Sequence, residues 1–145
     1  MPAEKTVRRI RNVTGHFVMK TTLTYKEKTG VIDDFKHQIE FETEVTDVEA
    51  TENIIQKLGY KLAIVYEKHR KAWLFNDVEI VLDELPFGYY MEIEGEKEAI
   101  LTTEKQLGAE DLTTEARGYP KLTAKFGTLL KSGVYESRFE KRTSA

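Results

Sequence analysis

Alternating apolar and polar side chains run through most of the chain, and this pattern predicts a protein built mainly of β-strands. The clearest case is HQIEFETEV at residues 37–45, where apolar and acidic side chains alternate. Successive side chains of a strand point to opposite faces, so this strand has an apolar face and a face that carries Glu40, Glu42 and Glu44. By the same criterion, we expect strands at residues 7–12, 16–26, 60–70, 71–76, 78–83 and 89–94.

Two stretches have the apolar spacing of amphipathic helices instead. The first begins at Thr46, which fits the N-cap of a capping box with Glu49, and it ends at Gly59. The second covers about residues 97–107, and a weaker helical pattern starts near residue 119. One domain over residues 1–145 accommodates all these elements, with flexible ends expected at residues 1–6 and about 132–145.

The chain is organised around a hairpin at residues 78–98, VEIVLDELPFGYYMEIEGEKE. Pro86 and Gly88 predict its turn, and Glu92 and Glu94 share one face of its second strand. Two like charges side by side are unfavourable unless something neutralises them. Water, basic side chains or a metal ion could do so, and which of these it is determines what the protein does.

Composition narrows the classes of function. The chain has 145 residues, of which 40% are hydrophobic and 32% charged, and its net charge is −3. This near balance argues against a general nucleic-acid binder, and the lack of cysteine excludes disulfides and thiolate metal sites. The three histidines are too widely spaced to indicate a zinc site. No apolar run reaches membrane-spanning length and no signal peptide is evident, so we expect a cytoplasmic protein without a membrane partner.

Charged side chains recur on one face of at least five expected strands. The basic ones are Arg9, Arg11, Lys26, Lys68 and Arg70, and the acidic ones are Glu40, Glu42, Glu44, Asp83, Glu92 and Glu94. If helices cover the apolar faces, the charged faces look toward one another across a curled sheet. Such a lumen suits a polyanion, whose phosphates Arg and Lys bind, together with a divalent cation held by carboxylates. The simpler alternative is a charged face that is solvated and has no function.

In these motifs the chain resembles the CYTH superfamily, also called triphosphate tunnel metalloenzymes, over about residues 7–122. Members of the superfamily include class IV adenylyl cyclases, thiamine triphosphatases and inorganic triphosphatases. The similar motifs, in family order and at family-like spacing, are Arg9-Ile-Arg11, Leu23-Thr-Tyr-Lys26, Glu40-Phe-Glu42, Leu58-Gly59-Tyr60, Glu67-Lys68-His-Arg70, and Val81-Leu-Asp83 followed by Glu92-Ile-Glu94.

The resemblance implies an α+β fold in which eight antiparallel strands form a β-barrel, or tunnel, with helices packed outside. It implies a metal-dependent enzyme that hydrolyses a triphosphate, such as thiamine triphosphate or tripolyphosphate, or that cyclises ATP. The phosphates would bind Arg9, Arg11, Lys26, Lys68 and Arg70. Glu42, Glu92 and Glu94 would hold Mg²⁺ or Mn²⁺, Glu40 and Asp83 would support them, and Glu92, Glu94 and Lys68 would be catalytic.

One family motif is missing from the sequence. Family members carry an E-x-E-x-K strand ahead of the paired arginines, whereas only Glu4-Lys5 stands there in this chain. We therefore expect an incomplete barrel, from either a truncated chain or a short form. A short form could be a non-catalytic phosphate-binding or assembly module that has lost half of the metal site. The open sheet edge could also pair with a second copy to form a homodimer.

Overall fold

The computed structural model describes residues 6–14, 19–32 and 35–140. Backbone contacts divide the chain into two compact units, residues 1–61 and residues 62–145. The first unit holds one three-stranded sheet and the second unit holds two.

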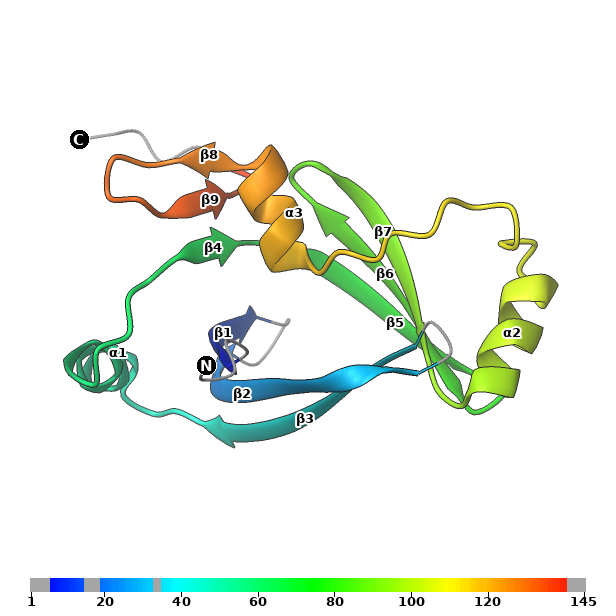
Figure 1. The fold of residues 1–145 in the computed structure, drawn as a ribbon, viewed down its shortest axis with the longest axis horizontal. Helices are drawn as coiled ribbons and strands as arrows, with labels where there is room; N and C mark the ends of the chain where they lie inside the picture. The colour runs from blue at the N-terminus through cyan, green and yellow to red at the C-terminus, as the bar shows by residue number, and fades with distance from the viewer. Residues whose placement is uncertain (1–5, 15–18, 33–34, 141–145) are drawn as a thin grey trace. The chain divides into compact units, whose positions relative to one another are not determined.

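The first unit is a meander of three antiparallel strands followed by one helix (Figure 1). Its elements are β1 (Thr6–Thr14), β2 (Met19–Ile32), β3 (Phe35–Glu44) and α1 (Val48–Lys57). The three strands expected in this part of the sequence are thus present. Strand β2 continues beyond its expected end at Lys26, because a register shift between Lys28 and Gly30 lets the pairing with β3 go on.

Helix α1 begins one residue later than the capping-box pattern predicts. Its N-cap is Asp47, whose side chain accepts a hydrogen bond from the backbone N–H of Ala50 at 2.9 Å. The expectation that Thr46 is the N-cap is therefore wrong, because Asp47 adopts the extended backbone of a cap and its carboxylate binds the amide three residues further on. At the other end Gly59 has a φ of +94°, a left-handed conformation that favours glycine, and the expected stop is confirmed.

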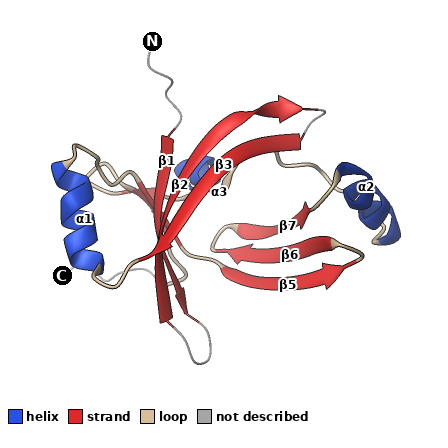
Figure 2. Ribbon diagram, turned by 90° about the horizontal axis from the view of Figure 1, so that it is seen from below, coloured by secondary structure: helices blue, strands red, loops and turns tan. Residues whose placement is uncertain are grey.

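The central hairpin of the sequence forms the main sheet of the second unit. Its strands are β5 (His69–Phe75), β6 (Val78–Leu85) and β7 (Gly88–Glu94), and they lie antiparallel, side by side (Figure 2). Asn76 and Asp77 connect β5 to β6 with φ values of 47° and 63°, as a tight hairpin turn requires. The hairpin expected at residues 78–98 is confirmed by the antiparallel pairing of β6 with β7.

The second unit also contains a smaller sheet, which corrects one expected strand. It consists of β4 (Ile64–Tyr66), β9 (Tyr135–Ser137) and β8 (Thr128–Leu129), with β9 in the middle. The strand expected at residues 60–70 is divided between β4 and β5. Part of the segment expected to be flexible from about residue 132 is paired: β9 pairs with β4, and Val134 and Ser137 are buried. Residues 1–5 and 141–145 lie outside the described residues.

Two helices complete the second unit, α2 (Lys97–Gln106) and α3 (Tyr119–Phe126). Helix α2 lies at one end of the β5–β7 sheet in both ribbon views (Figures 1 and 2) and ends before Gly108, as its sequence predicts. Helix α3 begins at the weaker helical pattern, with Pro120 in its first turn, where proline is tolerated. None of the helices in the described residues has the length and hydropathy that a membrane span needs.

The core of the second unit forms where α3 covers one face of the hairpin. Leu85 of β6 packs with Tyr119 and Leu122 of α3, and the rings of Tyr66 and Tyr90 pack against this cluster. The ring centroid of Tyr119 lies 6.0 Å from that of Tyr66 and 5.7 Å from that of Tyr90, in edge-to-face contacts. The core is therefore largely aromatic on the side where β6 also buries a carboxylate.

The α+β class expected from the sequence is confirmed. In the described residues every strand pair is antiparallel except β4 with β9. The hydrogen bonds group the strands into the sheets β1-β2-β3, β4-β9-β8 and β5-β6-β7. Closure of the strands into a single tunnel stays a prediction.

Candidate functional site

A buried carboxylate, that of Asp83, is the centre of the candidate site in the second unit. The Asp83 side chain is completely buried, although it belongs to a strand of a partly exposed sheet. Its cross-strand neighbour Arg70 donates two hydrogen bonds to it, from Nε at 2.7 Å and from Nη2 at 2.6 Å. This bidentate pairing fixes the plane of the guanidinium as well as its position.

Two further side chains reach the same carboxylate. The hydroxyl of Tyr119, on α3, donates a hydrogen bond to Asp83 Oδ2 at 2.5 Å. The Nζ atom of Lys68 lies 3.6 Å from Oδ2 and 5.0 Å from the centre of the Tyr119 ring. The carboxylate thus holds together two cationic side chains and one helix.

The electrostatics of the cluster keep Asp83 ionised. Burial alone would raise the pKa of Asp83, but hydrogen bonds from Arg70 and Tyr119 and the charge on Lys68 lower it below its usual value. The hydrogen bond to Asp83 raises the pKa of Arg70, and burial together with the hydrogen bond to Asp83 raises the pKa of Tyr119. Near neutral pH the cluster therefore contains one carboxylate, two cations and a neutral phenol.

The acidic pair predicted on β7 lies beside this cluster. Glu92 is the cross-strand partner of Val81, so it shares the buried face of β6 with Asp83. Its Oε2 is 3.5 Å from Arg70 Nη2, and its side chain is 41% exposed. Glu94 is exposed and stands opposite Glu79 on β6, another acidic residue. Arg70 Nη1 makes no hydrogen bond to any other described residue, so this edge of the guanidinium can bind an anion.

The carboxylates beside the cluster suit Mg²⁺ or Mn²⁺ only if ligands from outside the protein complete the coordination. The oxygens of Asp83 already accept hydrogen bonds from Arg70 and Tyr119, so the carboxylates left on this face of β6 and β7 are Glu92, Glu94 and the facing Glu79. No group of three or more metal-ligating side chains occurs among the residues that the structure describes. One or two carboxylates completed by phosphate oxygens and water are, however, the usual ligands of Mg²⁺. The residues therefore fit a divalent cation whose remaining ligands are water or the oxygens of a bound anion.

The first unit carries a second set of predicted site residues on one face of its sheet. Lys26 Nζ lies 2.7 Å from Glu40 Oε1, and Thr24 donates a hydrogen bond to Glu42 at 2.8 Å. Thr24 is 2% exposed, whereas Glu42 and Glu40 on the neighbouring strand are exposed. The alternation that placed these residues on a common face is confirmed by the register of β2 and β3.

The paired arginines are placed by their backbone alone. In the β1–β2 register, Arg9 is opposite Thr24 and Arg11 is opposite Thr22. Cross-strand partners share a face of a sheet, so both arginines belong to the row that continues to Glu42 and Glu44 on β3. The side chains of Arg9 and Arg11 lie outside the described residues.

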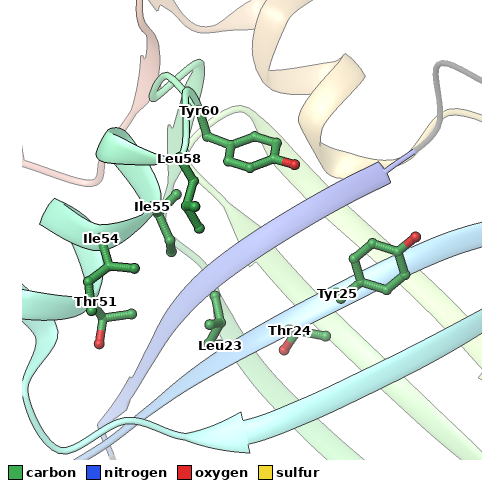
Figure 3. A pocket seen from close by; sticks show the side chains of 8 residues that line it. All are labelled: Leu23, Thr24, Tyr25, Thr51, Ile54, Ile55, Leu58 and Tyr60. Carbon is green, nitrogen blue, oxygen red and sulfur yellow. The ribbon is translucent and has the colours of Figure 1, made fainter. Parts of the chain in front are cut away.

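The opposite face of the first unit is apolar. There Leu23 and Tyr25 of β2 line a groove with Ile54 and Ile55 of α1 and with Leu58, the C-cap of that helix, and the volume of the groove is about 490 Å³ (Figure 3). The helix directs the apolar stripe predicted from its sequence toward this groove. Charged and apolar side chains therefore occupy opposite faces of the sheet, as the alternating pattern indicated.

Sequence reasoning did not identify Tyr119 as part of the site. It lies 36 residues from Asp83, and only the packing of α3 on β6 brings the two side chains together. The local sequence Gly118-Tyr-Pro120 marks the start of a helix but carries no signal of a partner. A buried aspartate in a predicted strand does require a donor, and this requirement is the one available hint.

The chain is similar in sequence to one protein family and in structure to two solved proteins. A family model described as the CYTH domain matches residues 3–119. A conserved hypothetical protein from Pyrococcus furiosus is similar in structure, with a TM-score of 0.69 and 26% sequence identity over 84% of this chain and 77% of that one. A protein from Pyrococcus horikoshii has a TM-score of 0.64 and 22% identity over 81% of this chain and 82% of that one. No curated protein matches the sequence.

Proposed function

Because this chain belongs to the CYTH domain family, within the triphosphate tunnel superfamily, we propose that it is a metal-dependent enzyme acting on a triphosphate or a nucleoside triphosphate. The observation that carries the proposal is the cluster around Asp83. Lys68 and Arg70 meet there on a buried carboxylate, and Glu92 lies 3.5 Å from the same guanidinium. The family match runs across both units, which supports one domain over residues 1–145.

In this proposal Lys68 and Arg70 bind phosphate oxygens. Arg70 can do so through Nη1 while Nε and Nη2 stay on Asp83, so the guanidinium meets the phosphate already oriented. Lys68 supplies a compact charge at the same place, and its position near Oδ2 limits how far it can move. Charge that develops on a transferred phosphoryl group would be stabilised by both cations.

The metal ligands in the proposal are Glu92 and Glu94, which stand two positions apart on one face of β7. Mg²⁺ or Mn²⁺ bound there would polarise a phosphoryl group and lower the pKa of a bound water. Asp83 acts differently: it holds Arg70 and Lys68 in place and does not ligate the cation. Arg9, Arg11, Lys26, Glu40 and Glu42 remain proposed phosphate and metal residues of the first unit, to be tested by their own variants.

The proposal is tested first by product analysis. The purified protein is incubated with tripolyphosphate, thiamine triphosphate or ATP, with Mg²⁺ or Mn²⁺ and with chelator, and the products are resolved by ion exchange. Metal-dependent release of orthophosphate identifies a phosphohydrolase, and cyclic AMP with pyrophosphate identifies a cyclase. Stabilisation by tripolyphosphate without turnover would instead identify a phosphate-binding module, and no turnover and no binding would refute the proposal.

A pair of variants separates the metal ligands from the fold. Glu92→Gln combined with Glu94→Gln removes both carboxylates but keeps the size of the side chains, and metal-dependent turnover should be lost. The matched control is Glu110→Gln, an exposed glutamate of the same unit. Circular dichroism should be unchanged in both proteins. An unchanged rate in the double variant would show that these carboxylates do not hold the metal.

A further inference from the structure

The segment Glu67–Arg70 carries both cations of the candidate site, and residues 137–139 near the C-terminus contact this segment. Strand β9 pairs with β4 in parallel, and the backbone N–H of Glu67 continues this ladder by donating to the carbonyl of Ser137 at 3.0 Å. Val134 and Ser137 are buried by the pairing. This part of the chain lies beyond residues 3–119, which the family model matches.

The side chain of Glu67 extends the attachment beyond the backbone. Its Oε2 accepts a hydrogen bond from the backbone N–H of Phe139 at 3.1 Å, and its Oε1 lies 3.3 Å from Arg138 Nη1. Arg138 is held in turn by Glu136, with Nε 3.1 Å from Oε2. Both carboxylate oxygens of Glu67 are thus engaged by the C-terminal segment.

A second contact follows two residues along the same segment. The ring of His69 is stacked on the ring of Phe139, with the centroids 4.2 Å apart and the planes at 1°. Glu67 and His69 therefore contact residues 138–139, whereas Lys68 and Arg70 contact Asp83. Neighbouring side chains of an extended chain point to opposite sides. The two sets of contacts therefore fix the backbone of residues 67–70 on both of its sides.

We infer that Glu67 is a positioning residue, and that Arg138 and Phe139 set the placement of Lys68 and Arg70 through it. This inference rests on the proposed function, because it concerns how the phosphate-binding cations are held. Global stability alone does not require the arrangement: the side chains of Glu67 and Arg138 are 43% and 20% exposed, so solvent screens this partly buried pair. A small displacement of two phosphate-binding cations, by contrast, weakens binding considerably.

The test uses the full-length protein and changes Arg138, so that the phosphate-binding segment keeps its sequence. Arg138→Ala should speed amide hydrogen exchange in a peptide spanning residues 64–71 and leave β6 (residues 78–85) unaffected. Arg138→Lys keeps a cation within reach of Glu67 and should restore protection. The matched control, Glu140→Ala, changes an exposed residue of the same segment. Exchange equal to the control, or equally faster in β6, would overturn the inference.

The same proteins are then titrated with tripolyphosphate in a calorimeter. Arg138→Ala should weaken binding about tenfold, the order expected when a residue that orients the binding side chains loses its own partner. Arg138→Lys and Glu140→Ala should bind as the parent protein does. Unchanged affinity in Arg138→Ala would also overturn the inference. If the parent protein does not bind tripolyphosphate, the proposed function fails, while the exchange experiment still decides whether Arg138 holds the segment.

Discussion

The hydroxyl of Tyr119 is the contact most open to a quantitative test. Tyr119→Phe removes one oxygen and keeps the ring, so the aromatic packing with Tyr66 and Tyr90 is retained. The lost hydrogen bond, at 2.5 Å, ends on a carboxylate that is completely buried. Hydrogen bonds to a charged group contribute roughly 1.5–3 kcal/mol. Arg70 and Lys68 still hold the carboxylate in the variant, so we expect the free energy of unfolding to fall by about 2 kcal/mol.

The assay is urea unfolding near neutral pH, followed by tryptophan fluorescence. Trp73 is the only tryptophan of the chain and lies on β5, in the sheet that contains Asp83, so its emission reports on the second unit. The matched control is Tyr90→Phe, which removes a hydroxyl from the same aromatic cluster. That hydroxyl makes no hydrogen bond to another described residue, and its loss should cost about 0.5 kcal/mol or less.

Two outcomes would refute this account of Tyr119. The first is an equal loss in Tyr119→Phe and Tyr90→Phe, which would mean that the hydroxyl contributes nothing specific. The second comes from the double variant with Asp83→Asn. If Tyr119 acts on the charge of Asp83, the two changes are not additive, and a coupling of about 1 kcal/mol or more should remain. Additive losses would place the effect of Tyr119 elsewhere.

Two further predictions concern single residues. Folding lowers the pKa of Asp83 below its usual 3.8. The stability that Asp83 contributes is therefore fully present above pH 3.8 and is lost as pH falls through the folded pKa. Measured by urea unfolding across this range, the free energy of unfolding should change less with pH in Asp83→Asn than in the parent protein. In the first unit Asp47→Ala should destabilise α1 by about 1 kcal/mol, whereas Thr46→Ala should have little effect, as measured by amide exchange at Thr51. Equal exchange in these two variants would contradict the assignment of the cap.

Local order was accessible from the sequence because it depends on near neighbours. The period-two pattern located the strands β1 to β3 and β5 to β7, and the faces of Glu40, Glu42, Glu92 and Glu94. Glycines after apolar stripes marked the ends of α1 and α2. The cap of α1 was missed because Thr46 and Asp47 both suit an N-cap, and the choice between them depends on backbone geometry.

What only the tertiary structure decided is which distant groups meet. The sequence indicated that Lys68, Arg70 and Asp83 share a charged face, but not that Asp83 is fully buried or that Tyr119 caps it. It also left the C-terminal segment as a tail, although β9 pairs with β4 and residues 138–139 hold Glu67. These contacts join residues 36 to 72 positions apart. Periodicity carries no information over such separations, because the partners are selected by the packing of whole helices and strands and by the need of each buried charge for a donor.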